Sequence, residues 1–190
     1  MKYYTKQSSG NELGIFSIRG DLDGGKESSD FFQARQFIGF LVGLEEFLLP
    51  IDVMNEIIML NQLTFVPGSQ EYIEGVINLR GKIIAAINIR KMMGLPHTKP
   101  TNSTRVIIAR YDDINAGLIV DGITYVVSLH PDQMETHSLS GKGKGANLIS
   151  GIAKRGDQVN GIIDICKILN EAGAKIGSSS ENEDLKKDAQ

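Results

Sequence analysis

The sequence repeats itself, and this repeat constrains the fold more than any other feature. One constant offset aligns Phe37 with Val106, Leu49 with Leu118 and Asp52 with Asp121. A second, slightly larger offset aligns Gly75 with Gly151 and Ile87-Asn88-Ile89 with Ile163-Asp164-Ile165. Neither alignment needs an internal gap, and the order is the same in both halves. We therefore interpret the chain as two related units, about Arg35–Pro100 and Thr101–Asn170.

Both units consist of short apolar runs separated by turn residues. Examples are Phe37–Val42 before Gly43-Leu44-Glu45-Glu46, and Val106–Tyr111 before Asp112-Asp113. Runs that are this short, β-branched and bounded by turns favour strands. About five strands per unit suit a small closed barrel, which also leaves no open sheet edge. The sequence therefore predicts an all-β fold of two barrels in tandem.

Helix is expected in two short turns only. In Asp52–Ile57, Asp52 could serve as the N-cap residue. In Ile89–Met93, the following Gly94 could end the helix.

The two ends of the chain differ from the repeated units. Residues 1–34 and 171–190 are polar and lack apolar periodicity, so we expect an N-terminal extension and a C-terminal tail that are mostly disordered. The first ten residues contain no apolar run typical of a signal peptide. No aliphatic run approaches the ~20 residues that cross a bilayer, so we expect a cytoplasmic protein without membrane insertion.

Composition argues against several classes of function. The net charge is −3, the middle segment carries 13 basic and 13 acidic residues, and the chain has no Trp. A barrel that binds single-stranded nucleic acid should have a basic face with interleaved aromatic residues, so this alternative class is disfavoured. The single cysteine and the three histidines, His97, His130 and His137, lack metal-ligand spacing. We expect neither enzyme activity nor a cofactor or metal, and a small enzyme remains a further alternative.

One pair of charged residues remains as a candidate site. The segment Gly75–Ile84 places Arg80 at a turn before a strand, and Glu56 lies in an apolar context. If both line the seam of one barrel, the two side chains could pair. Such a pair could be an ordinary surface ion pair, worth about 0–1 kcal/mol. It could equally belong to a binding surface on which the arginine orients a partner.

Five motifs in order resemble the CheW-like chemotaxis coupling domain. They are Gly75-Val76-Ile77-Asn78-Leu79-Arg80-Gly81, Ile87-Asn88-Ile89-Arg90, Gly117-Leu118-Ile119-Val120-Asp121, Gly151-Ile152-Ala153-Lys154 and Ile162-Ile163-Asp164-Ile165. The resemblance covers about Arg35 to Asn170. Two positions depart from it: Asn88 stands where the family usually has Asp, and Ala85 replaces a common Pro.

The resemblance implies two SH3-like five-stranded barrels around a shared core and a scaffold without catalytic activity. The implied partners are the cytoplasmic tips of chemoreceptors and the regulatory domain of a CheA-type histidine kinase. The implied location is the receptor array at the inner face of the membrane. The pathway is flagellar chemotaxis or, alternatively, pilus motility or another output.

The resemblance also implies a set of receptor-contacting residues. Arg80 matches the receptor-binding arginine, Glu56 the acidic residue that can pair with it, and Met54 an apolar position facing the receptor. Asn78 and Leu79 belong to the same motif as Arg80.

Overall fold

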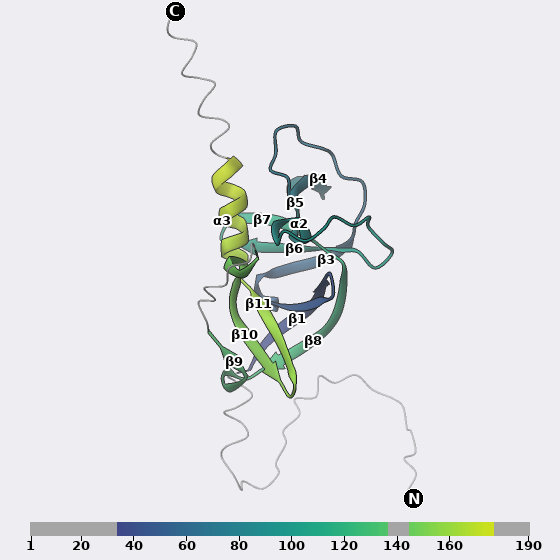
Figure 1. Ribbon diagram of the computed structural model, residues 1–190. Helices are drawn as coiled ribbons and strands as arrows, with labels where there is room; N and C mark the ends of the chain where they lie inside the picture. The colour runs from purple at the N-terminus through teal and green to yellow at the C-terminus, as the bar shows by residue number, and fades with distance from the viewer. Residues whose placement is uncertain (1–33, 137–144, 177–190) are drawn as a thin grey trace, which may run out of the picture.

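Figure 1 shows the computed structural model of the protein, which describes residues 34–136 and 145–176. These residues form two β-sheets. The five-stranded sheet contains, in spatial order, β3 (Met54–Met59), β6 (Arg105–Tyr111), β7 (Ile114–Val120), β5 (Lys82–Asn88) and β4 (Ile73–Leu79). The six-stranded sheet contains β8 (Gly122–Leu129), β1 (Arg35–Val42), β2 (Glu45–Pro50), β11 (Gln158–Ile163), β10 (Ile149–Arg155) and β9 (Met134–Glu135). The expected all-β fold with two barrel-like units is confirmed, and β9 adds a sixth strand to one of them.

Turn chemistry explains the four hairpins β1–β2, β4–β5, β6–β7 and β10–β11. Each joins two antiparallel strands through a two-residue turn. The first turn residue has a positive φ in every case: 69° at Gly43, 51° at Arg80, 51° at Asp112 and 57° at Gly156. This conformation gives the turn a twist that matches the twist of the flanking strands. Local sequence therefore determines these pairings.

Each sheet nevertheless takes strands from both repeats. The hairpin β1–β2 of the first repeat lies between β8 and β11 of the second. The hairpin β6–β7 of the second repeat lies between β3 and β5 of the first. The division into barrels at Arg35–Pro100 and Thr101–Asn170 is therefore wrong. Each of these two hairpins has two outer edges, and strands of the other repeat pair with both of them.

The repeat itself maps element onto element. The smaller of the two sequence offsets places β1, β2 and β3 on β6, β7 and β8, and the larger offset places β4 and β5 on β10 and β11. The spatial orders β8-β1-β2-β11-β10 and β3-β6-β7-β5-β4 are the same order with the repeats exchanged. The two barrel-like units are thus equivalent by an exchange of their first hairpins.

Three groups of buried apolar side chains hold the sheets together. The largest, which we call the shared core, draws on both sheets and includes Phe40, Leu49, Leu118 and Ile163. Ile77, Ile84 and Ile108 belong to a smaller group within the five-stranded sheet. Phe37, Leu48 and Leu129 belong to the corresponding group within the six-stranded sheet. Each large apolar side chain that is fully buried stabilises the fold by about 1.5–3 kcal/mol.

The expected helical turn at Asp52–Ile57 is mostly wrong. Only a 3-10 turn, η1 (Ile51–Val53), forms there, and its N-cap residue is Pro50 rather than Asp52. The strand β3 begins at Met54 and pairs with β6, a contact between residues far apart in sequence that outweighs local helix preference. The second expected helix forms as α2 (Ile89–Met92), and Gly94 follows it with a φ of 73°.

A longer helix, α3 (Ile165–Ile176), corrects the expected start of the C-terminal tail at residue 171. Its buried residues are Ile165, Ile168, Leu169 and Ala172. They recur at intervals of three and four, which places them on one face of a helix. That face packs against the shared core. Asp164 caps the first turn, because its Oδ1 accepts a hydrogen bond of 3.2 Å from the amide of Lys167.

The segments expected to be disordered are residues 1–34 and 171–190. Of these, residues 1–33 and 177–190 lie outside the described residues, as does His137. Among the described residues, no helix combines the length and the apolar character needed to span a bilayer.

Candidate functional site

The hairpin β4–β5 presents Arg80 at its tip. Leu79 and Lys82 form the last strand pair, and the turn residues Arg80 and Gly81 have positive φ angles of 51° and 84°. The Asn78 side chain stabilises this turn, because its Oδ1 accepts a hydrogen bond of 2.9 Å from the Gly81 amide. The motif Asn78-Leu79-Arg80-Gly81 therefore encodes a tight turn that projects the arginine.

Arg80 pairs with Glu56 of the neighbouring edge strand β3. The distance between Arg80 Nη2 and Glu56 Oε2 is 3.1 Å. The Arg80 side chain is 80% exposed and that of Glu56 is 32% exposed. An ion pair this open to solvent contributes about 0–1 kcal/mol. The Arg80–Glu56 ion pair considered from the sequence thus forms. Its small contribution to stability does not explain why the chain has it.

A pocket of about 170 Å³ opens beside this ion pair. We call it the hairpin pocket, and its lining consists of Asn55, Glu56, Leu79, Arg80, Lys82, Ile84, Ile108 and Asn115. Ile84 and Ile108 are 4% and 2% exposed, so the pocket reaches the apolar interior of the five-stranded sheet. At the rim, Asn55 Nδ2 donates a hydrogen bond of 3.3 Å to Asn115 Oδ1. The pocket combines an apolar base with a charged and amide-lined rim.

The five residues expected to bind the receptor do not all lie together. Glu56, Leu79 and Arg80 line the hairpin pocket. Asn78 is exposed beside it and forms the turn. Met54 lies outside the pocket, half-buried against the shared core. A register shift in β3 between Met54 and Glu56 accompanies this separation.

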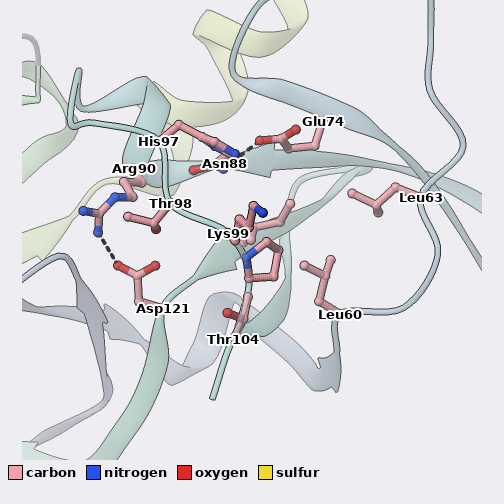
Figure 2. A pocket seen from close by; sticks show the side chains of 12 residues that line it. Leu60, Leu63, Glu74, Asn88, Arg90, His97, Thr98, Lys99, Thr104 and Asp121 are labelled. Atoms are coloured by element: carbon pink, nitrogen blue, oxygen red, sulfur yellow. Dashed lines mark hydrogen bonds and ion pairs between the residues drawn. The ribbon is translucent and has the colours of Figure 1, made fainter. Parts of the chain in front are cut away.

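A second polar cluster, drawn in Figure 2, joins elements from both repeats. Arg90 of α2 forms an ion pair of 2.7 Å with Asp121, which lies between β7 and β8. Asp121 also accepts a hydrogen bond of 2.6 Å from the amide of Gly43 in the β1–β2 turn. Arg90 Nε donates to the carbonyl of Pro96 at 2.6 Å. Because these charges are satisfied within the chain, the cluster acts as a clamp between the two sheets.

Arg90 and Asp121 line a second pocket, which Glu74 also lines. Glu74 faces Asn88 there (Figure 2). Glu74 Oε1 accepts a hydrogen bond of 2.8 Å from Asn88 and lies 3.0 Å from Lys91 Nζ. Burial disfavours the charged form of Glu74. The hydrogen bonds from Lys91 and Asn88 and the nearby charges of Lys91 and His97 outweigh that effect and lower the pKa of the carboxyl group. Asn88, the departure from the family pattern, also caps α2 through its bond with the Lys91 amide.

Most residues around the hairpin pocket and the second polar cluster were not predicted as site residues from the sequence. The clamp residues Arg90 and Asp121 stand in two of the quoted motifs, so the motifs were a usable signal for them. Asn55 and Asn115 are 60 positions apart and meet only because β3 and β7 flank β6. No local pattern marks that contact.

Comparison with known proteins agrees with this architecture. The CheW-like domain family model matches residues 36–173. The Chemotaxis protein CheW of Helicobacter pylori is 31% identical over 159 residues, which are 83% of this chain and 94% of that protein. The Chemotaxis protein CheW of Bacillus subtilis is 33% identical over 141 residues, which are 74% of this chain and 90% of that protein.

A solved structure has the same fold. The crystal structure of scaffolding protein TtCheW from Thermoanaerobacter tengcongensis superposes with a TM-score of 0.65 and 31% identity, covering 69% of this chain and 89% of that one. The chain therefore belongs to the CheW-like family, whose members are non-catalytic adaptors of chemotaxis signalling.

Proposed function

We propose that this adaptor couples the cytoplasmic tips of chemoreceptors to a CheA-type histidine kinase, and that the receptor binds at Arg80 and Glu56. Met54, Asn78 and Leu79 are the further receptor-facing residues of this proposal. The kinase regulatory domain binds another surface, so that one adaptor holds both proteins at the receptor array. Holding the kinase there raises its effective concentration at the receptors. A receptor can then bias the kinase by changing conformation.

One observation carries the receptor site: the backbone of Arg80. Its φ of 51° lies in the left-handed region, where a residue with a Cβ costs roughly 1–2 kcal/mol. The equivalent position in the second repeat is Gly156, which adopts a φ of 57° without that cost. A strained residue at a position that suits glycine suggests that its side chain has a function. An arginine fork suits binding, because it can donate two parallel hydrogen bonds to a carboxylate.

The proposal is tested by titrating variants against a receptor tip fragment and, separately, a kinase regulatory domain. Arg80→Ala should weaken receptor binding by about 1–3 kcal/mol, as expected for an interface arginine that becomes desolvated. Kinase binding should change much less. Glu56→Ala should have a smaller effect and should be non-additive with Arg80→Ala, because the two side chains touch.

Two further variants separate binding from folding. Arg80→Gly should be at least as stable as the wild-type protein, since it relieves the left-handed strain, yet it should lose receptor binding. Arg35→Ala is the matched control, because Arg35 also forms an exposed ion pair, at 3.0 Å from Asp52. If folded Arg80→Ala binds the receptor fragment like wild type, the site is wrong. If it loses both partners equally, Arg80 organises the fold instead.

A further inference from the structure

The hairpin pocket has a counterpart in the six-stranded sheet that the repeat identifies residue by residue. The equivalent pairs are Glu56 with Tyr125, Ile108 with Gly39, Asn115 with Glu46 and Ile84 with Asn160. The hairpin pocket and its counterpart can therefore be compared as equivalent ends of the two barrel-like units.

In the six-stranded sheet this end is filled by Tyr125. A Cβ atom on Gly39 would clash with Thr124 Oγ1 and lie 3.3 Å from the Tyr125 ring, so these two side chains share the space that Gly39 leaves. The Tyr125 hydroxyl donates a hydrogen bond of 2.6 Å to Glu46 Oε2, which also accepts one of 3.2 Å from the buried Asn160. The Arg155 guanidinium covers the outer face at 4.3 Å from the ring centroid. The chain thus closes this barrel end with its own aromatic side chain.

In the five-stranded sheet the same end is open. Glu56 replaces the aromatic ring and turns to Arg80, which leaves the hairpin pocket of about 170 Å³. Ile84 and Ile108 replace Asn160 and Gly39, so the base of the pocket is more apolar than its counterpart. Apolar cavities of about 150 Å³ hold a benzene-sized group. The size of the pocket and its apolar base therefore suit one apolar side chain.

The rim of the hairpin pocket carries an excess of positive charge. Arg80 is paired with Glu56, whereas Lys82 is exposed and has no ion-pair partner among the described residues. Two cations and one carboxylate leave a net charge of about +1 at the rim, which favours an acidic group on the partner.

We propose that the hairpin pocket binds one apolar side chain of the partner, and that a carboxylate of the same partner lies next to it on Arg80 and Lys82. The partner supplies the plug that Tyr125 supplies in the other barrel. This inference rests on the proposed function, since it takes the chemoreceptor tip as the partner, and it adds the chemistry by which that tip is recognised.

The first test follows the pocket in the unaltered protein. The side-chain amide groups of Asn55 and Asn115 give separate signals in nitrogen-edited NMR spectra. Adding a receptor tip fragment should shift both signals, because the two amides stand at the rim of the pocket.

The second test changes the pocket. Asn115→Phe places an aromatic ring at the rim of the hairpin pocket, and it should lower affinity for the receptor fragment at least about tenfold by occupying the space. Lys82→Glu should also lower affinity and should reduce the dependence of binding on salt, because it removes an attractive charge. Ser128→Phe is the matched control, since Ser128 is exposed on β8, and it should bind like wild type.

The outcomes distinguish this inference from the proposed function. The inference is overturned if Arg80→Ala weakens binding while Lys82→Glu binds like wild type and the amides of Asn55 and Asn115 do not shift. In that case the receptor site at Arg80 stands without the pocket. If Arg80→Ala also binds normally, both proposals fail together. Because the amide shifts need no substitution and Lys82 is exposed, the result does not depend on whether Asn115→Phe folds.

Discussion

At the scale of single residues, the ion pairs of this protein fall into two groups. Arg90–Asp121 and Lys91–Glu74 are half-buried, with side-chain exposures of 18% and 33% in the first pair and 22% and 24% in the second. Arg80–Glu56 is far more exposed on its arginine side. Removing one partner of a half-buried pair leaves a charge that water solvates poorly. Substitutions in the first group should therefore affect stability, and substitutions at Arg80 should affect binding.

Glu74 provides a pH-dependent test of the first group. Its pKa is lowered from the usual 4.5 in the folded protein, so the ionised group stabilises the fold above about pH 4.5. This contribution is lost as pH falls through the lowered pKa. The difference in unfolding free energy between wild type and Glu74→Gln should be largest at neutral pH and should shrink below pH 4.5. Urea unfolding at pH values from 7 to 3 measures it, and a difference that stays constant with pH would contradict the expectation.

At the scale of elements, α3 is the clearest case of a helix that belongs to the fold rather than to a tail. Ala172 is 4% exposed and lies in the shared core. Tyr72 Oη donates a hydrogen bond of 3.2 Å to the carbonyl of Glu171, which ties α3 to the segment before β4. The helix therefore packs on the core at least as far as Ala172.

Two truncated variants test this role of α3. A chain ending at Glu171 loses Ala172 and the last helical turn, and its melting temperature should fall by a few degrees, equivalent to about 1–2 kcal/mol. A chain ending at Ile176 should melt close to the full-length protein, because it keeps the whole helix. Equal melting temperatures for the two variants would show that the helix end contributes nothing.

At the scale of the whole molecule, the exchange of hairpins makes the two repeats interdependent. The parallel pairings β2–β11 and β5–β7 each join one repeat to the other, and the Arg90–Asp121 clamp does the same. Neither half of the sequence contains a complete sheet. Cooperative unfolding of both barrel-like units in one transition is the expected behaviour.

Separate halves of the chain test this interdependence. Residues 35–100 alone and 101–176 alone should each lack the dispersed NMR spectrum of a folded protein, since each lacks strands of both sheets. Mixing the two fragments should restore a folded complex. A folded, monomeric 35–100 fragment would instead support two independent barrels.

The sequence alone determined the features that depend on neighbouring residues. The strands, the four tight hairpins and the projection of Arg80 follow from β-branched runs and turn residues, which act over a few positions. The repeat likewise showed that two equivalent units exist. The period of Ile165, Ile168, Leu169 and Ala172 also encodes α3, although the predicted second unit ends at Asn170, within this helix.

Which hairpin joins which sheet depends on contacts between distant parts of the chain. Because the two repeats have nearly the same pattern of apolar residues, each edge strand could pair with either copy, and no local signal separates the two choices. The difference between the two barrel ends arises in the same way. Tyr125 fills its pocket because Gly39, across the β1–β8 pairing, leaves space for the Thr124 and Tyr125 side chains, whereas Ile108 and Glu56 leave the equivalent pocket open. Contacts between residues far apart in the chain set that difference, and the candidate site depends on it.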